Sequence, residues 1–283
     1  MPELPEVETI VRTLAPQLSG RRIEDARVLH EKSLAAGRTL LPRLRGARIG
    51  AVLRRAKLVL IELRPACGGR LSLLFHLKMT GRLFVHEPRT EACKHTRLVF
   101  RLGDDAGRTR DGKGAQLFFD DARKFGYCRI MRDEDFAHWA FWNALGPEPL
   151  ACSREEFISR CRERRGKIKA LLLDQSFIAG IGNIYADEIL FRAGIDPQYA
   201  ATRLSHARLG VLWERMREVL REAIAQCGSS IRDYRDASGN AGAFQNSFRV
   251  YGRSGLPCLT CGSILEKTVV AGRGAVRCPG CQK

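Results

Sequence analysis

The stretch from residue 258 to residue 281 reads CLTCGSILEKTVVAGRGAVRCPGC and holds two Cys-x2-Cys pairs separated by 16 residues. Four thiolates at this spacing can surround one ion tetrahedrally, which closes a structural zinc site and leaves no open position for catalysis. Disulfide bonding is the alternative, but the six other cysteines follow no pairing pattern and fit reduced thiols. The sequence therefore predicts one structural Zn²⁺ bound by Cys258, Cys261, Cys278 and Cys281.

The residues between the two cysteine pairs predict a short hairpin. Apolar patterning favours strands over 264–270 and 275–277, joined by a turn Ala271-Gly272-Arg273-Gly274. Arg273 would then stand at the tip of a zinc-braced hairpin, between glycines that allow a partner to approach closely. An ordinary solvated turn residue is the alternative interpretation, and we favour a nucleic-acid contact for Arg273.

The segment preceding the hairpin is expected to be helical. Ser153 and Glu156 form a capping box, and apolar periodicity predicts helices over 167–174, 183–193 and 205–227. A double turn from Asp174 to Asn183 joins two of them. Its glycines leave backbone amides accessible ahead of a helix N-terminus, which can bind phosphate. A plain helix hairpin capped by Asn183 is an equally good interpretation.

The first half of the chain shows a different pattern. One helix is expected near the N-terminus, because Val7, Ile10, Leu14 and Leu18 recur at helical spacing and Ser19-Gly20 follows them. From about residue 23 to residue 132, short apolar runs alternate with glycine-rich breaks. Many short strands with one leading helix favour a β-sandwich, so the expected fold class is α+β.

The charge of the chain points to a polyanionic partner. Its 48 Lys and Arg against 31 Asp and Glu give a net charge of +17 over 283 residues, with a pI near 9.9. The excess is clustered, with seven basic residues and no acidic one from Arg38 to Lys57. We favour nucleic acid over membrane lipid, since the sequence has no basic amphipathic anchor. It also lacks an apolar signal segment or membrane-length run, so a soluble intracellular protein is expected.

The N-terminal residues Met1-Pro2-Glu3 are candidates for covalent chemistry. Removal of Met1 would expose the secondary α-amine of Pro2, which titrates near pH 8 and is partly unprotonated at neutral pH. Such an amine can attack a sugar carbon and form a cationic iminium, and Glu3 beside it can exchange protons. The alternative is purely structural, because proline and acidic residues also suit the first turn of a helix.

Three further residues lie where strands pass into loops. Met79 and Phe125 are expected in the core on general grounds, but apolar side chains beside Arg123 are also what a protein needs to unstack a duplex. The sequence leaves both interpretations open.

Taken together and in this order, these segments resemble the bacterial formamidopyrimidine-DNA glycosylases of the helix–two-turns–helix DNA glycosylase family. The resemblance runs from Met1 to Lys283. It is carried by Pro2-Glu3-Leu4-Pro5-Glu6-Val7-Glu8, Arg54-Arg55-Ala56-Lys57, Gly146-Pro147-Glu148-Pro149-Leu150, Gly180-Ile181-Gly182-Asn183-Ile184-Tyr185-Ala186, Val250-Tyr251-Gly252-Arg253 and the four cysteines.

The resemblance implies a role for each matching residue. Pro2 would attack C1′ of the damaged nucleoside, Glu3 would handle protons at the sugar, and Lys57 would assist elimination. Arg273 is also implied in catalysis, through its grip on a phosphate. The residues implied in DNA binding are Glu6, Met79, His95, Arg123, Phe125, Arg164, Lys169, Asn183 and Tyr251.

The resemblance also implies the organisation and the activity. Residues 1–133 would form the catalytic β-sandwich domain, 134–152 a linker, 153–228 the helix–two-turns–helix domain, 229–248 a lesion-capping loop and 249–283 the zinc hairpin. The implied enzyme is a monomeric, cytoplasmic and nucleoid-associated base-excision glycosylase and abasic-site lyase. It would remove 8-oxoguanine and formamidopyrimidines from duplex DNA by β,δ-elimination, using no catalytic metal or organic cofactor.

Two other functions compete with this one. An endonuclease VIII-like enzyme would remove oxidised pyrimidines, but that branch typically opens Pro-Glu-Gly-Pro, whereas Leu4 stands here. A non-catalytic zinc protein that binds damaged DNA would require no free Pro2 amine. The chain also departs from the family pattern at Ala122, where proline is usual, at Lys124, where arginine is usual, and at Lys78, where glycine is commoner.

Overall fold

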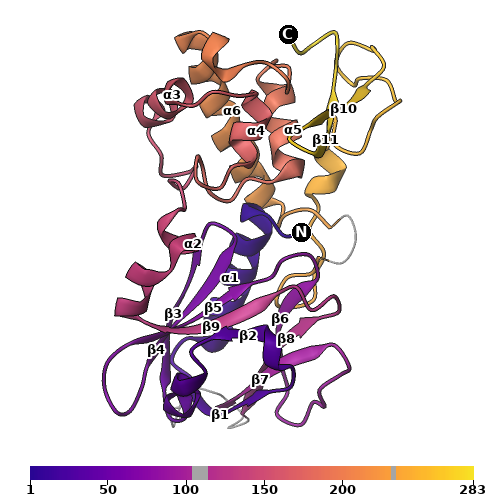
Figure 1. The fold of residues 1–283 in the computed structure, drawn as a ribbon. Coiled ribbons are helices and arrows are strands. Elements are labelled where there is room, and N and C mark those ends of the chain that lie inside the picture. The colour runs from indigo at the N-terminus through magenta and orange to yellow at the C-terminus, as the bar shows by residue number, and fades with distance from the viewer. Residues whose placement is uncertain (104–113, 231–233) are drawn as a thin grey trace. The chain divides into compact units, whose positions relative to one another are not determined.

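The computed structural model describes residues 1–103, 114–230 and 234–283. The chain forms two units (Figure 1), the first from Met1–Asn143 and Cys227–Gly242, the second from Ala144–Gln226 and Ala243–Lys283. Within the described ranges, no helix combines the length and apolar composition that crossing a bilayer requires.

The first unit contains a nine-stranded sheet in the order β2-β9-β5-β4-β3-β1-β7-β8-β6. Its neighbours pair antiparallel except β2 with β9. The elements are α1 (Leu4–Leu18), β1 (Arg22–Val28), β2 (Leu34–Ala36), β3 (Arg48–Arg55), β4 (Leu58–Arg64), β5 (Leu71–His76), β6 (Gly81–His86), β7 (Thr96–Gly103), β8 (Ala115–Asp121), β9 (Tyr127–Arg132) and α2 (Ala140–Asn143), with 3-10 turns at Glu31–Ser33, Arg38–Leu44 and Asp133–His138.

This sheet folds back on itself as a sandwich, which confirms the expected class. The ring of Phe75 on β5 lies 6.1 Å from that of Phe100 on β7 and 5.5 Å from that of Phe119 on β8, although several strands separate them in the sheet. β1 and β3 share one paired register, Arg22 with Arg48, and the sheet can bend at this weak junction. The apolar faces therefore enclose one core.

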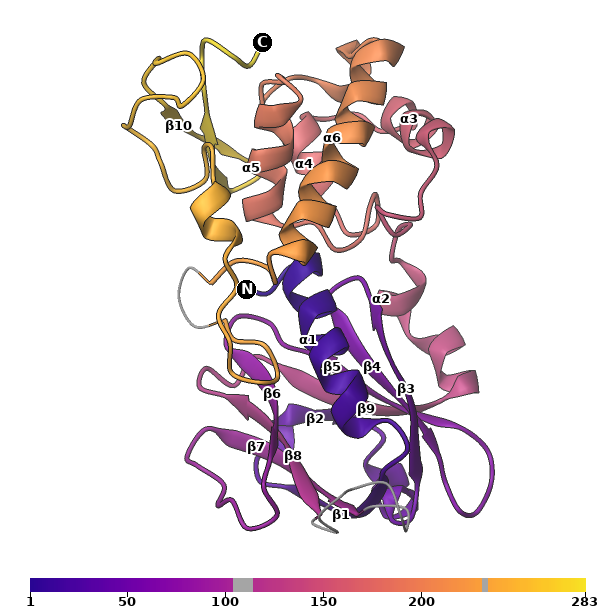
Figure 2. The same ribbon diagram turned by 180° about the vertical axis from the view of Figure 1, so that it is seen from behind.

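Helix α1 forms where the apolar spacing predicted it. Val7, Ile10, Leu14 and Leu18 are buried, and the helix packs on β3, β4 and β6 (Figure 2). Pro5 suits its first turn because the missing N–H would be unsatisfied there in any case. The burial of this stripe fixes the N-terminal residues against the sandwich.

The second unit is helical and ends in a two-stranded hairpin. Its elements are α3 (Arg154–Glu163), α4 (Ile168–Leu173), α5 (Asn183–Arg192), α6 (His206–Ala225), 3-10 turns at Ala201–Arg203 and Phe244–Ser247, β10 (Glu266–Val270) and β11 (Arg273–Arg277). Ser153 caps α3 by accepting from the Glu156 amide at 3.1 Å, which is one of the two hydrogen bonds of the predicted capping box. Phe157, Phe177 and Tyr185 fill the core between the helices.

Two local predictions were wrong by one or two residues. The N-cap of α5 is Gly182, and Asn183 is the first helical residue. The hairpin turn was predicted to span Ala271 to Gly274, but it consists of Ala271 and Gly272 alone, whose backbones are both in the left-handed conformation. Arg273 is therefore the first residue of β11 and pairs with Val270. A two-residue turn of this kind matches the twist of the paired strands better than the longer turn that the glycines suggested.

Candidate functional site

The N-terminal residues are held by one carboxylate. Pro2 and Glu3 are buried, and the Glu3 amide donates to Glu6 Oε2 at 2.8 Å. The other oxygen of Glu6 accepts from the backbone amide of Ser229 at 2.7 Å and from its hydroxyl at 3.0 Å. A buried carboxylate needs several donors, and here it joins the start of α1 to a segment more than 220 residues away.

The surroundings of Glu6 explain the glycine next to Ser229. Gly228 has a φ of +75°, and a β-carbon there would meet Glu6 Oε1 at 2.8 Å. The Tyr234 hydroxyl donates to the Glu6 backbone carbonyl at 3.3 Å. Burial, and then the charge of Glu6, raise the pKa of Tyr234, so its phenol stays protonated.

Lys57 lies directly after the left-handed residue Ala56, in the turn between β3 and β4, and is buried. Arg54 anchors this turn by donating to Glu8 at 2.8 Å and to the Ala56 carbonyl at 3.2 Å. Burial alone would raise the pKa of Glu8, but the hydrogen bond and charge of Arg54 lower it overall. The turn is therefore tied to α1.

His76 is a site residue that the sequence analysis missed. Burial, followed by the charges of Lys78 and Lys57, lowers its pKa to about 3, so the imidazole is neutral at physiological pH. Its Nδ1 accepts from the Lys78 amide at 3.1 Å, and its ring lies 5.6 Å from that of Tyr127. A histidine at the end of a fully buried strand was the available signal.

The three predicted wedge residues come together at the surface of the first unit. Met79 is 43% exposed and Phe125 is 55% exposed, although both are large apolar side chains. Arg123 lies between them: its Nη1 is 3.1 Å from the Met79 sulfur and its Cζ is 4.9 Å from the Phe125 ring centroid. Core packing is therefore not what these side chains do here.

Asp121 holds the two wedge loops together and was not predicted. It is fully buried, and its carboxylate accepts from the Thr80 hydroxyl, from the Arg123 amide at 3.2 Å and from the Gly126 amide at 2.6 Å. Its own amide donates to the His95 carbonyl at 2.9 Å. One carboxylate thus holds the backbone at Arg123 and just after Phe125, and also binds the side chain that follows Met79.

We expect Asp121→Asn to loosen this loop, because an amide group offers one acceptor oxygen where the carboxylate offers two. The free energy of unfolding should fall by about 2 kcal/mol, the usual worth of hydrogen bonds to a buried charge. Hydrogen-exchange mass spectrometry should show faster exchange across 122–126.

Asp120→Asn is the matched control, since Oδ1 of Asp120 has no hydrogen-bond partner among the described residues. Unchanged exchange in Asp121→Asn, or equal loosening in the control, would show that the carboxylate does not hold the loop.

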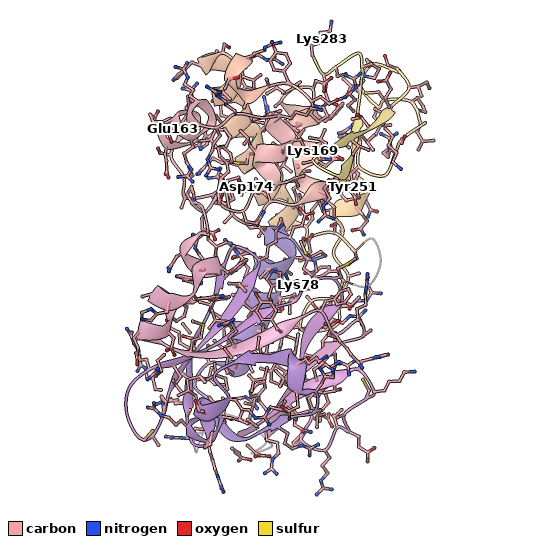
Figure 3. All side chains as sticks on the ribbon, viewed as in Figure 1. Lys78, Glu163, Lys169, Asp174, Tyr251 and Lys283 are labelled. Atoms are coloured by element: carbon pink, nitrogen blue, oxygen red, sulfur yellow. The ribbon has the colours of Figure 1, made fainter. Side chains whose placement is uncertain are left out.

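In the second unit, the carboxylate of Glu188 holds the loop that carries Tyr251, by hydrogen bonds to backbone amides like those that Asp121 accepts. Glu188 is fully buried on α5 and accepts from three successive amides: Arg249 at 3.0 Å, Val250 at 3.0 Å and Tyr251 at 2.9 Å. This loop carries Tyr251, which is partly exposed (Figure 3). The signal in the sequence was two adjacent acids inside an apolar helix.

Lys169 is placed differently from what a phosphate contact suggests. It is fully buried, with its ammonium 2.7 Å from Asp187 Oδ1 and donating to the Gly274 carbonyl at 2.7 Å (Figure 3). Burial raises the pKa of Asp187 to about 6, even though Lys169 opposes the shift. Asp187 also accepts from the Val276 amide at 3.2 Å. The pair therefore fastens β11, which presents Arg273 exposed to solvent.

The double turn before α5 is held by side chains. The amide of Gly180 donates to Gln175 Oε1 at 2.9 Å, so it is engaged within the fold and the expectation of an accessible amide was wrong there. Oδ1 of Asn183 is buried without a hydrogen-bond partner among the described residues. The proposed phosphate contact of Asn183 stays a prediction.

Two further predictions are only partly placed. Arg164 is exposed at the end of α3, with its Nη1 3.5 Å from Asp174 Oδ2. The predicted capping loop, 229–248, includes residues 231–233, which lie outside the described part of the chain. The roles of both remain predictions.

The four cysteines form one structural zinc site. Their sulfur atoms all lie within 4.8 Å of one another, and two of the separations are 3.9 Å and 3.3 Å. A tetrahedral ion with Zn–S bonds of about 2.3 Å requires sulfurs about 3.8 Å apart, so the donor set fits. Four thiolates complete the coordination of the ion, and its role is to brace the hairpin.

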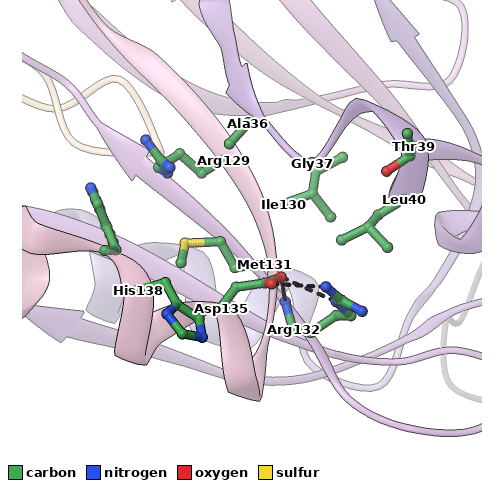
Figure 4. Close-up of a pocket in the computed structure, with 11 residues that line it drawn as sticks. Ala36, Gly37, Thr39, Leu40, Arg129, Ile130, Met131, Arg132, Asp135 and His138 are labelled. Carbon is green, nitrogen blue, oxygen red and sulfur yellow. Dashed lines mark hydrogen bonds and ion pairs between the residues drawn. The ribbon is translucent and has the colours of Figure 1, made fainter.

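A cavity of about 420 Å³ lies against β9 in the first unit (Figure 4). Arg132 closes one side by donating to Asp135 at 3.0 Å, and Arg129 lies 4.7 Å from the ring centroid of Trp139. None of the residues that the sequence singled out lines this cavity. The candidate site therefore consists of the side chains described above and does not include this cavity.

Comparison with known families covers most of the chain. Residues 1–128 match the formamidopyrimidine-DNA glycosylase N-terminal domain, and residues 145–235 match the formamidopyrimidine-DNA glycosylase H2TH domain. Residues 255–283 match the zinc finger found in FPG and IleRS.

Individual relatives agree over their full length. A formamidopyrimidine-DNA glycosylase of Nitratidesulfovibrio vulgaris is 43% identical, with all of both chains covered. Among solved structures, a Lactococcus lactis FPG variant bound to DNA containing Fapy-dG is 33% identical with a TM-score of 0.88 over all of both chains. Wild-type Lactococcus lactis FPG bound to DNA containing an oxidised pyrimidine is 32% identical with a TM-score of 0.87, again over all of both chains.

Proposed function

This chain belongs to the formamidopyrimidine-DNA glycosylase family, and from this premise we propose that it is a bifunctional DNA glycosylase and abasic-site lyase of base excision repair. Its substrates are oxidised purines in duplex DNA, chiefly formamidopyrimidines and 8-oxoguanine. The observation that carries the proposal is the N-terminal Pro2-Glu3 pair, held by Glu6 in a chain that matches the family over its full length.

The chemistry begins once Met1 has been removed. The Pro2 nitrogen forms a bond to C1′ as the glycosidic bond breaks, and the base leaves with a proton. The nitrogen then loses its own proton, and the C1′–O4′ bond breaks with a proton going to O4′, which opens the sugar ring and leaves an iminium. The iminium acidifies C2′, which loses a proton while the bond to the 3′ phosphate breaks. A second elimination releases the 5′ phosphate. Glu3 is assigned the proton transfers at the sugar, and Lys57 assists the eliminations from its buried turn.

Extrusion of the damaged nucleotide precedes attack, because C1′ is inaccessible to an amine inside a stacked duplex. Exposed Met79 and Phe125, with Arg123 between them, support a wedge that fills the vacated space. The buried carboxylate of Asp121 gives this wedge a fixed backbone. Unstacking costs a few kcal/mol, and a preorganised wedge avoids an additional ordering cost.

The second unit supplies phosphate contacts in this proposal. Tyr251 and Arg273 are the groups we assign to the flanking phosphates, with Asn183 at the start of α5. The loop and the strand that carry Tyr251 and Arg273 are anchored on Glu188 and Asp187. The ammonium of Lys169 is enclosed by the protein, so we assign this residue an indirect role. It holds in place the hairpin that carries Arg273. His95 and Arg164 are proposed as peripheral contacts.

A paired excision assay tests the lesion class. We expect release of 8-oxoguanine and formamidopyrimidine to exceed release of thymine glycol by at least about tenfold in kcat/KM, or about 1.4 kcal/mol in transition-state binding. Identical duplexes that differ in the lesion alone provide the comparison.

Equal or reversed preference would favour the endonuclease VIII-like alternative. The assay measures excision rather than binding, because the Lactococcus lactis FPG structure shows that an FPG also binds DNA containing an oxidised pyrimidine. Binding without excision of any lesion would favour a non-catalytic damaged-DNA-binding protein.

We further propose that the enzyme acts as a monomer in the bacterial cytoplasm and associates with the nucleoid.

A further inference from the structure

Left-handed backbone at non-glycine residues is concentrated beside the proposed functional groups. Such conformations are strained for residues that carry a β-carbon, and they persist where the surrounding structure enforces them. Five described residues adopt them: Ala56, Lys78, Lys124, Cys227 and Ala271. Ala56 precedes Lys57, and Lys78 precedes Met79, so in both places the strained residue sets the direction of the next side chain.

Lys78 is distinguished by the way its side chain is held. It has a φ of +50° in the turn between β5 and β6 and is partly buried (Figure 3). Its ammonium lies 5.8 Å from the ring centroid of Tyr127, and its amide donates to His76. The lysine stem thus lies along the end of the sheet rather than extending freely into solvent.

Among residues 1–103, 114–230 and 234–283, no opposite charge pairs with Lys78. The neighbouring His76 adds no negative charge, since its imidazole is uncharged: burial, Lys78 and Lys57 all lower its pKa. A partly buried ammonium that is neither paired nor fully solvated binds an anion favourably.

We propose that Lys78 binds a phosphate of the DNA strand into which Met79 inserts. The assignment rests on the proposed function and adds a contact that the wedge and the N-terminal residues do not supply. Lys78 and Met79 are consecutive, and the left-handed backbone at Lys78 sets the direction of both side chains. The same turn would therefore insert Met79 into the duplex and bind a DNA phosphate through Lys78. A purely structural role, in which Lys78 braces Tyr127, makes a different prediction about salt dependence.

The test measures affinity for a duplex with a tetrahydrofuran abasic analogue, which cannot undergo the chemistry, between 50 and 300 mM KCl. A variant that lacks the Lys78 charge would neutralise one phosphate fewer and release one counterion fewer on binding. The slope of log Kd against log salt should then fall by about 0.9, and binding should weaken about eightfold at 0.1 M salt. We expect this for Lys78→Asn and Lys78→Gly, since both tolerate the left-handed turn without the charge. Lys78→Arg should retain the slope.

Arg101→Gln is the matched control. It also removes one exposed positive charge, but Arg101 lies near the C-terminal end of β7 and is not one of the proposed DNA contacts. An unchanged slope in Lys78→Asn and Lys78→Gly, or an equal drop in Arg101→Gln, overturns the proposal. Thermal midpoints check folding, and Lys78→Gly should match or exceed the wild type by up to about 2 °C because the strain is relieved.

The two failures are distinguishable. Absence of a borohydride-trapped complex with the unmodified chain would refute the proposed function, whereas the salt slope on the tetrahydrofuran duplex needs no catalysis. A trapping enzyme with an unchanged Lys78 slope would refute the phosphate site alone.

Discussion

Retention of a residue ahead of Pro2 should abolish the covalent chemistry. In a peptide bond the proline nitrogen shares its lone pair with the carbonyl, so it is no longer a nucleophile. We expect base excision and borohydride trapping to fall by about a thousandfold or more, the scale on which losing a nucleophile acts. The measurement compares a chain that starts at Pro2 with one that keeps Met1, each verified by intact mass.

The matched measurement is binding to the tetrahydrofuran duplex, which should change by less than about threefold because Met1 is half exposed and the wedge is untouched. Excision at the wild-type rate by the chain that keeps Met1 would rule out the Pro2 Schiff base. A parallel loss of binding would mean that the extension disturbs the fold around Glu6.

Removal of zinc is expected to have the second-largest effect. The hairpin packs in a small cluster of six buried residues, of which Phe191 on α5 and Val250 lie outside the zinc module. A two-stranded hairpin is marginal in water by itself. Structural zinc contributes on the order of 10 kcal/mol to such modules. We expect Cys278→Ser to lower zinc content from one equivalent to below about a tenth and to weaken duplex binding at least about a hundredfold.

Cys67→Ser is the control, since Cys67 is exposed and lies outside the cluster. Zinc content is measured by elemental analysis and affinity by anisotropy on the same preparations. Two contacts between the hairpin and the helices do not involve zinc, namely Lys169 with Gly274 and Asp187 with Val276. If these sufficed to order Arg273, the zinc-free protein would keep its affinity, and the role assigned to the metal would be wrong.

The same structural arrangement occurs separately in each unit. Glu6, Asp121 and Glu188 are buried carboxylates that accept from backbone amides of loops carrying proposed functional residues. An ionised carboxylate inside a protein is costly unless several donors surround it, and backbone amides provide those donors in a fixed geometry. The same hydrogen bonds hold in place the loops that carry the proposed DNA contacts.

What the sequence determined by itself is local. Four cysteines at a fixed spacing specify their metal because ligand type and geometry suffice. The apolar repeat of α1 and the capping serine of α3 were equally readable, since a helix is built from neighbours three and four residues apart. The N-terminal proline could be proposed as a nucleophile because that chemistry depends on its own nitrogen.

Only the tertiary structure decided which charged groups are presented and which are enclosed. Lys169 belongs to a basic cluster in the sequence, yet it is fully buried against Asp187. Asp121 and Glu6 look like ordinary surface acids until residues distant along the chain arrive as donors. Burial and long-range pairing depend on which segments distant in the sequence pack together, and local residue patterns do not predict those contacts.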